Sequence, residues 1–187
     1  RFEPDGTVTI ITGTLDYGQG HAAAYAQVLT SRLGIPFERI RLLQGDRGLL
    51  VAGGGTGGSR SITASGTAIV EAAAKVIEQG KQLAAFVLEA AAADIEFANG
   101  RFTIVGTDRS IEIMALAAKL RTSLALPEGL PRTLDVSHAS EPIPSTFPNG
   151  CHVAEVEVYP DTGIVELVKY TMVNEFGTVI NPMLVEG

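Results

Sequence analysis

The sequence has no tryptophan, one cysteine and three histidines among its 187 residues, and each scarcity excludes a class of site. A single cysteine, Cys151, cannot form an internal disulfide framework and fits a reducing compartment, so we expect the cytoplasm. Cys151 and the histidines His21, His138 and His152 fall on different predicted elements, so we expect no metal-ligand cluster. No Ser-His-Asp arrangement can be argued from the spacing either.

Basic residues and long apolar runs are scarce as well. Lys and Arg number 14 against 21 Asp and Glu, so the net charge is −7 and nucleic acid is not expected as a partner. No apolar run has the length of about 20 residues that spans a bilayer. With 45% hydrophobic and 19% charged residues, the chain is expected to be globular. An anionic ligand would therefore depend on local N–H groups and a few cations.

The pattern of apolar residues predicts an α+β chain with a mixed or antiparallel sheet and packed helices. We interpret residues 1–187 as one unit with a soft boundary near residues 124–131. The predicted elements are strands at 7–12 and 39–44, helices at 22–33 and 59–89, a hairpin with a type I′ turn at Asn99-Gly100, a helix at 111–120 capped by Ser110, a strand at 133–139, and a hairpin at 152–173 with one buried face. Gly80 could break the long helix in two.

The most informative stretch is residues 53–61, with five glycines in the first six positions, followed by Ser59, Arg60 and Ser61. Glycine leaves the backbone bare, and the free N–H groups of a following helix form an anion site that an Arg strengthens. The bland alternative is a flexible glycine linker with an ordinary Ser cap. Residues 53–61 are not a P-loop, because no Lys follows the glycines. They are not a dinucleotide-binding fingerprint either, because no strand runs directly into them.

A second turn of the same kind is formed by Gly18, Gln19, Gly20 and His21, which precede the helix at 22–33. The Gln19 amide can donate and accept, and the glycines would let backbone N–H groups reach a ligand. His21 could equally be a surface residue or a ligand contact. Two such turns, one helix and one strand apart, could converge on one extended phosphorylated ligand. On its residues alone, the chain is predicted to bind and not to catalyse.

Four blocks of the sequence resemble the molybdopterin-binding large subunit of molybdenum hydroxylases, the family of xanthine dehydrogenase, aldehyde oxidase and aerobic carbon monoxide dehydrogenase. The blocks are residues 12–21, 33–36, 55–61 and the pair 156–163 with 180–187, in the family's order and over nearly the whole chain. The resemblance implies a molybdenum held by a pterin, commonly in the cytosine dinucleotide form. It also implies iron–sulfur and FAD-binding domains or subunits as partners.

The resemblance also implies the contacts. The residues expected at the cofactor are Gly18, Gln19, Gly20, His21, Thr56, Gly58, Ser59, Arg60, Ser61 and Asn181. The family's active-site loop and its catalytic glutamate are expected outside this piece, which would then be inactive alone and could lack cofactor. Such a piece could also pair as a homodimer through apolar surface.

Two departures from the family pattern accompany these blocks. Gly57 stands where the family often has an aromatic residue, and Glu175-Phe176 where it often has Asp-Cys. Two alternatives therefore stay open beside the hydroxylase interpretation. One is a non-redox module that binds a phosphorylated ligand, and the other is a structural domain whose glycine loops are degenerate.

Overall fold

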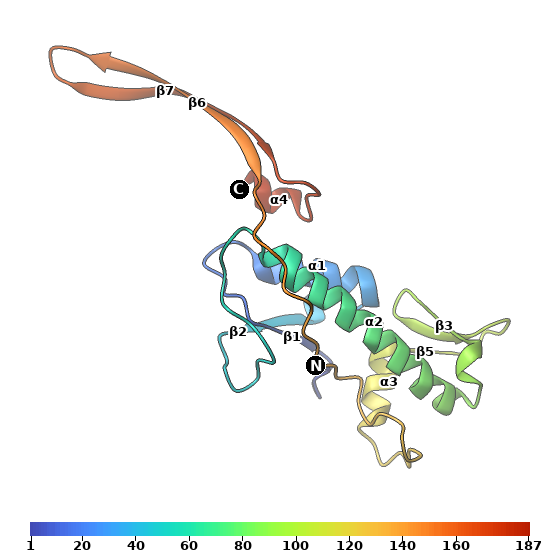
Figure 1. The fold of residues 1–187 in the computed structure, drawn as a ribbon. Helices are drawn as coiled ribbons and strands as arrows, with labels where there is room; N and C mark the ends of the chain where they lie inside the picture. Colours follow the sequence, from blue (N-terminus) through green and yellow to red (C-terminus); the bar gives the residue numbers. More distant parts are fainter.

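The computed structural model describes residues 1–187 and begins with a strand, a helix and a parallel strand (Figure 1). Strand β1 (Val8–Thr12) pairs in parallel with β2 (Ile40–Gln44), so that Val8 lies opposite Ile40 and Thr12 opposite Gln44. Helix α1 (His21–Leu33) connects them, followed by the short 3-10 turn η1 (Phe37–Arg39). Both strands and the helix were expected from the sequence, and the α+β fold class is confirmed.

Helix α1 ends where the sequence predicts, at Gly34. This residue is left-handed (φ 64°), and its N–H donates to the carbonyl oxygen of Thr30 over 2.8 Å. At the start of the helix His21 is buried and Ala22 is exposed. The His21 imidazole, not the Ala22 methyl group, therefore faces inward, and Tyr25, Ala26, Leu29 and Leu33 continue the same buried face.

Helix α2 (Ser61–Leu88) is continuous through Gly80, so the predicted break there is wrong. A Cβ at Gly80 would lie 2.2 Å from the ring of Phe102, which is fully buried. Glycine is needed at this position because the ring packs directly on the helix backbone. Ala73 and Val76 of this helix are buried, whereas Ala74 is exposed.

A small antiparallel sheet packs beside the C-terminal half of α2. It consists of β3 (Ile95–Ala98), β4 (Arg101–Ile104) and β5 (Ser110–Glu112), with the 3-10 turn η2 (Ala92–Asp94) before it. Asn99 (φ 48°) and Gly100 (φ 78°) are both left-handed, as the predicted type I′ turn requires.

The predicted helix cap at Ser110 is wrong. Ser110 lies in β5 opposite Thr103, and its hydroxyl accepts a bond from the Arg101 guanidinium over 3.1 Å. Helix α3 (Ile113–Leu120) therefore begins after Glu112, which makes no side-chain cap. The pairing of residues 110–112 with β4 satisfies backbone groups that a first helical turn would have left free.

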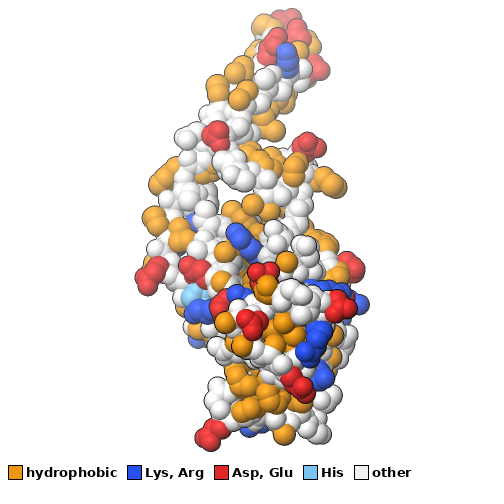
Figure 2. Space-filling model, turned by 90° about the vertical axis from the view of Figure 1, so that its right-hand side faces the viewer, with side chains coloured by type: hydrophobic (Ala, Val, Ile, Leu, Met, Phe, Trp, Pro, Cys, Tyr) orange, Lys and Arg blue, Asp and Glu red, His pale blue; other side chains and the backbone are white.

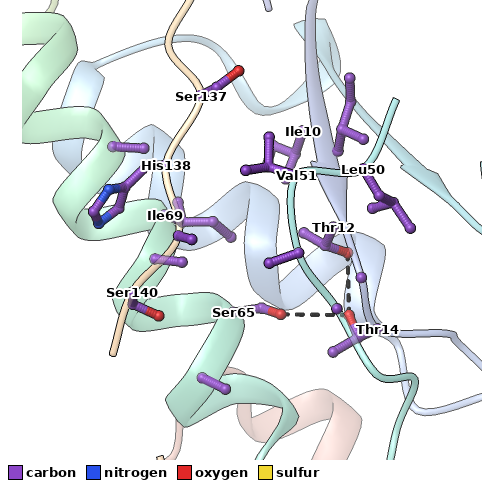
Figure 3. Close-up of a pocket in the computed structure, with 18 of the residues that line it drawn as sticks. Ile10, Thr12, Thr14, Leu50, Val51, Ser65, Ile69, Ser137, His138 and Ser140 are labelled. Carbon is purple, nitrogen blue, oxygen red and sulfur yellow. Dashed lines mark hydrogen bonds between the residues drawn. The ribbon is translucent and has the colours of Figure 1, made fainter. Parts of the chain in front are cut away.

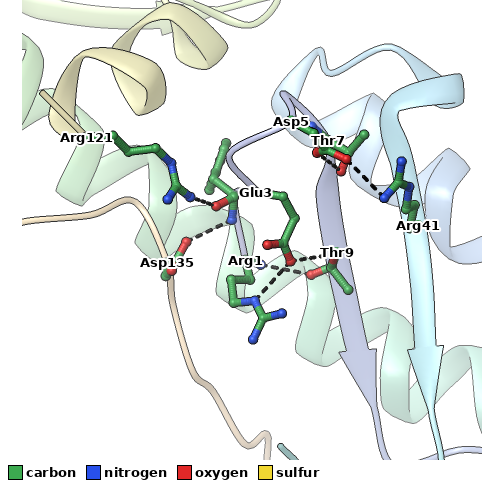
Figure 4. Close-up of polar contacts among 9 residues, drawn as sticks. Arg1, Glu3, Asp5, Thr7, Thr9, Arg41, Arg121 and Asp135 are labelled. Carbon is green, nitrogen blue, oxygen red and sulfur yellow. Dashed lines mark hydrogen bonds and ion pairs between the residues drawn. The ribbon is translucent and has the colours of Figure 1, made fainter.

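Residues 133–139 do not form the strand that we expected, because side chains and not a ladder hold them (Figure 4). The Asp135 carboxylate accepts the N–H of Phe2 over 2.8 Å, the Arg121 guanidinium donates to the carbonyl oxygen of Phe2, and Leu134 is 1% exposed. The edge of β1 is instead met by Phe2, which forms an antiparallel bridge with Val8. Residues 133–146, here called the strap, run back along α2.

The last long elements form an arm that projects from the helices (Figure 1). Strands β6 (Asn149–Tyr159) and β7 (Ile164–Glu175) are an antiparallel hairpin, as predicted, but the predicted buried face is exposed. Apolar side chains line the arm in Figure 2, and Val156 and Val158 lie opposite Leu167 and Val165. The alternation does encode an apolar face, but no other element of residues 1–187 packs on it. Helix α4 (Pro182–Glu186) follows.

The core is a cluster of 20 buried apolar residues contributed mainly by β1, α1, α2 and α3. None of the helices has both the length and the apolar character to cross a membrane.

Candidate functional site

The two glycine-rich turns meet at one edge of the β1–β2 sheet. Each turn follows the carboxyl end of a parallel strand and opens a helix, so the shared direction of the strands brings both turns to the same edge. The Tyr25 hydroxyl of α1 donates to the carbonyl oxygen of Ser61, the first residue of α2, over 3.2 Å. The two helix starts are therefore held together by a direct hydrogen bond.

Backbone contact fastens the second turn to the end of β1. The Gly55 N–H donates to the carbonyl oxygen of Gly13 over 2.9 Å, and a Cβ at Gly13 would lie 2.2 Å from the Cα of Gly53. The Thr56 hydroxyl accepts the N–H of Leu15 over 2.9 Å and donates to its carbonyl oxygen over 2.6 Å. Thr56, predicted as a cofactor contact, thus has its hydroxyl committed to the joint between the turns.

The first turn is closed by an acid that the sequence analysis did not single out. The carboxylate of Asp16 accepts the N–H groups of Gly18 over 2.8 Å, of Gln19 over 2.7 Å and of His21 over 2.9 Å. Desolvation opposes the charge of this carboxylate, but the three N–H donors outweigh it and lower the pKa of Asp16. The backbone donors that we expected to face a ligand are therefore given to Asp16.

A buried polar cluster lies beneath this first turn. His21 is 5% exposed, and its ring stacks on Tyr25 with 5.1 Å between centroids. The Thr14 hydroxyl lies 3.1 Å from the Tyr25 hydroxyl of α1 and 3.5 Å from the Ser65 hydroxyl of α2, so it links the end of β1 to both helices. Figure 3 shows its contact with Ser65. The Gln44 amide donates to Thr14 over 3.0 Å.

Sequence reasoning missed Asp16, Thr14 and Gln44. Their positions could have identified them, because each is a polar residue at or just after the carboxyl end of a predicted strand. Parallel strands present ligand-facing residues at that edge of a sheet.

The second turn is open where the first is closed. The N–H groups of residues 59–63 donate to no acceptor in the chain, and the first helical bond of α2 runs from Ala64 to Arg60. Ser59 is left-handed (φ 52°), and nothing lies within 4 Å of a Cβ built at Gly55 or Gly57. A bare backbone with a run of free N–H groups is the arrangement that binds phosphate at a helix start.

The strap supports this open turn from outside. Arg60 donates through Nη1 to the carbonyl oxygen of Ile143 over 3.0 Å, which leaves its other N–H donors free. Thr146 bonds to the carbonyl oxygens of Gly58 and Ser59, and a Cβ at Gly58 would lie 2.4 Å from the Ser145 hydroxyl. Gly58 is thus needed for the strap to approach.

Asn181, the last predicted contact, acts as a brace. Its Nδ2 donates to Gln27 Oε1 over 2.8 Å, and its Oδ1 accepts the N–H of Leu184 over 3.2 Å as the cap of α4. The Leu184 side chain covers Gly20, where a Cβ would lie 2.7 Å from it. The segment at residues 181–186 therefore lies against the first turn.

A cavity of 760 Å³ opens beside the site, between β1, α2, the glycine loop and the strap (Figure 3). Its walls are largely apolar, with Ile10, Val51 and Ile69 among them. Of the predicted cofactor contacts only Arg60 and Ser61 reach its lining, so the cavity borders the second turn and does not contain the first.

The comparisons with known proteins identify the family of the chain. The family described as the molybdopterin cofactor-binding domain matches residues 1–187. The chain belongs to this family. The resemblance to molybdenum hydroxylase large subunits is thereby confirmed, and the chain is a segment of such a cofactor-binding domain.

Similar proteins carry this segment within much longer chains. The carbon monoxide dehydrogenase large chain of Hydrogenophaga pseudoflava is 35% identical over 187 residues, which are 100% of this chain and 23% of the relative. The nicotine 6-hydroxylase large subunit of Paenarthrobacter nicotinovorans is 34% identical over 190 residues, again 100% and 23%.

Solved structures give the same result. A crystal structure of Cu,Mo-CO dehydrogenase in the carbon monoxide reduced state has a TM-score of 0.81 at 32% identity, with coverage of 100% of this chain and 23% of that one. Quinoline 2-oxidoreductase from Pseudomonas putida 86 has a TM-score of 0.78 at 31% identity, with coverage of 100% and 24%.

Proposed function

We propose that this chain holds the anionic part of a molybdopterin cofactor at its second glycine turn, within a larger molybdenum hydroxylase. The observation that carries the proposal is the run of free N–H groups at residues 59–63 beside Arg60. The net charge of the chain is −7, so an anion needs such a local cluster of donors to bind at all. The bare backbone at Gly55 and Gly57 leaves room for a bulky group to approach, so the residues present fit the cofactor.

The other predicted residues divide into contacts and supports. We assign contact roles to the Gln19 amide and the His21 ring at the first turn, and to Ser59, Arg60 and Ser61 at the second. We assign support to Gly18, Gly20, Thr56, Gly58 and Asn181, whose polar groups or backbone already contact Asp16, the joint between the turns, the strap or α4 and its flanking residues.

When bound, the cofactor supplies a molybdenum centre that accepts electrons from the substrate. This chain's own part is to bind and orient the pterin, and no side chain in it is assigned a catalytic role. We infer the cytosine dinucleotide form, because the row of donors at the second turn suits a ligand with more than one phosphate.

For the whole protein we propose oxidative hydroxylation of an aldehyde or N-heterocycle, or oxidation of carbon monoxide. Relatives named as carbon monoxide dehydrogenase and nicotine 6-hydroxylase support this range. We further propose iron–sulfur and FAD-binding partners that carry electrons away, and a cytoplasmic location.

The test uses the full-length protein that contains this segment, produced in a host able to make the cofactor. Molybdenum would be quantified by elemental analysis, and the released nucleotide identified by mass. We expect stoichiometric molybdenum with a pterin cytosine dinucleotide. A mononucleotide pterin would correct the form alone, whereas a phosphorylated ligand without metal or pterin would favour the non-redox module and overturn the proposal.

A further inference from the structure

Gln44, the last residue of β2, lies at the centre of the polar cluster under the first turn. Its Oε1 accepts the N–H of Asp16 over 3.1 Å. Its Nε2 lies 3.0 Å from the Thr14 hydroxyl and 3.1 Å from that of Thr12. The N–H of Asp16 can only donate, so the amide oxygen must face it and the amide nitrogen must face the cluster.

This orientation places a donor against His21. Gln44 Nε2 lies 3.4 Å from His21 Nδ1, the longest of its three contacts, so its two hydrogens are shared among three neighbours. Because Nδ1 faces an NH2 group that can only donate, Nδ1 is the acceptor of this contact. With Nδ1 as the acceptor, the ring N–H is on Nε2, which has no hydrogen-bond partner within residues 1–187. The ring is further fixed by its stacking on Tyr25, and Asp16, the charged group nearby, accepts the His21 backbone N–H.

We propose that Gln44 is a positioning residue that fixes the tautomer of His21 and so presents Nε2–H as a donor to the cofactor. The inference rests on the proposed function, in which the first turn contacts the cofactor. It assigns to Gln44 a role that acts through His21 and not through contact with the ligand.

Replacing the Gln44 amide by a carboxylate distinguishes control of the His21 tautomer from a purely structural role of Gln44. Gln44→Glu keeps an oxygen for the Asp16 N–H and nearly the same volume, but it replaces the donor that faces His21 Nδ1 by an acceptor. The proton of His21 would then be drawn to Nδ1, and Nε2 would lose its place as the donor toward the ligand.

The experiment uses the full-length holoprotein with Gln44→Glu, His21→Ala and the double variant. Gln82→Glu, an exposed position on α2, is the control that makes the same charge change. The readouts are the rate of pterin release, followed by fluorescence of the oxidised pterin, and the melting temperature of each variant. Neither readout depends on catalysis.

We expect Gln44→Glu and His21→Ala each to release pterin about 3- to 10-fold faster, the range of one lost hydrogen bond. The double variant should release it no faster than His21→Ala alone, because both changes remove the same contact. Gln82→Glu should behave as the unaltered protein. A role in support alone would lower the melting temperature and would add to the effect of His21→Ala.

Three outcomes would overturn the inference. If His21→Ala speeds release and Gln44→Glu does not, Gln44 does not act through His21, and the proposed function stands. If the two effects multiply in the double variant, Gln44 acts by another route. If His21→Ala itself leaves release unchanged, the first turn does not contact the cofactor and both proposals fail there. Should Gln44→Glu not fold, Gln44→Met, which also lacks the donor, makes the same test.

Discussion

The two glycine turns look alike in sequence and differ in what their backbone donors do. Both follow a parallel strand and open a helix, but the first is closed on the carboxylate of Asp16, whereas the second leaves the N–H groups of residues 59–63 free. An acid built into the first turn occupies the place that an anionic ligand could take, so that turn offers side chains instead. Glycine content alone does not make an anion site, because a carboxylate within the same turn can accept the N–H groups that an anion would need.

The largest effect is expected from Gly13→Ala, which would separate the second turn from β1. The new Cβ would lie 2.2 Å from the Cα of Gly53 and 2.5 Å from the carbonyl oxygen of Ala52, and backbone cannot yield as a flexible side chain can. We expect a loss of more than about 3 kcal/mol of stability, beyond ordinary overpacking. Thermal melting checks it, with Gly54→Ala as the control, because a Cβ there meets nothing within 4 Å. Equal melting temperatures for the two variants would contradict the close contact.

Next in size is Asp16→Ala, which would open the first turn. Loss of an acceptor shared by three N–H groups should cost about 1–2 kcal/mol, the upper part of the range for a lost helix cap. Hydrogen exchange of the Gly18, Gln19 and His21 amides should accelerate. Asp46→Ala is the matched control, since that carboxylate accepts a single N–H, from Gly48, over 2.9 Å. Unchanged exchange in the first turn would show that another group closes it.

The same contact predicts a pH dependence. The pKa of Asp16 is lower in the folded state, because its three N–H donors outweigh desolvation. Its contribution to stability is therefore present above the ordinary carboxyl pKa and is lost as the pH falls through the folded pKa. Protection of the first turn, corrected for intrinsic exchange, should fall in that acid range in the unaltered protein. In Asp16→Asn it should be flat, whereas the second turn should show no such change in either protein.

A smaller effect is expected from Arg60→Ala, which acts on the ligand and not on the fold. The guanidinium is exposed and holds one strap carbonyl, so loss of its charge should speed cofactor release about fivefold, roughly 1 kcal/mol, with little change in melting. Release should also become less dependent on salt. Arg39→Ala, exposed before β2 at the far end of the strand, removes the same charge as a control. If both variants release cofactor alike, Arg60 is only a surface charge.

Much of the fold was predictable because the conformational preferences of neighbouring residues determine it. The type I′ turn at Asn99 and Gly100 and the left-handed end of α1 at Gly34 follow from backbone preferences of single residues. Where pairing between separate segments determines the secondary structure, the prediction from local sequence was wrong. Ser110 has the chemistry of a cap, but it became part of β5 because β4 bonds to its backbone.

The candidate site was predictable only in outline, for the same reason. The glycines mark the two turns, but Asp16 and Gln44 acquire their roles from neighbours that the fold brings together. Gln44 is 23 residues from His21 in the chain, and only the parallel pairing of β1 with β2 puts it beneath the first turn. The arm formed by β6 and β7 shows the converse case. Its alternating pattern correctly predicted a hairpin with one apolar face, but no element within residues 1–187 buries that face.

The smallest effect on stability, and the most direct probe of the open turn, is expected from Gly57→Ala. Gly57 is not in the left-handed region and a Cβ there meets nothing within 4 Å, so melting should shift by no more than the equivalent of about 0.5 kcal/mol. Gly55→Ala, in the same open space but at φ 82°, should cost about 1 kcal/mol through backbone strain alone.

These two variants test whether the cofactor or only solvent occupies the space over the second turn. If the cofactor lies over the second turn, Gly57→Ala should speed pterin release although the protein without cofactor melts normally. Release and melting that are both unchanged would place the cofactor away from Gly57, and the open backbone of the second turn would then serve the approach of another part of the protein.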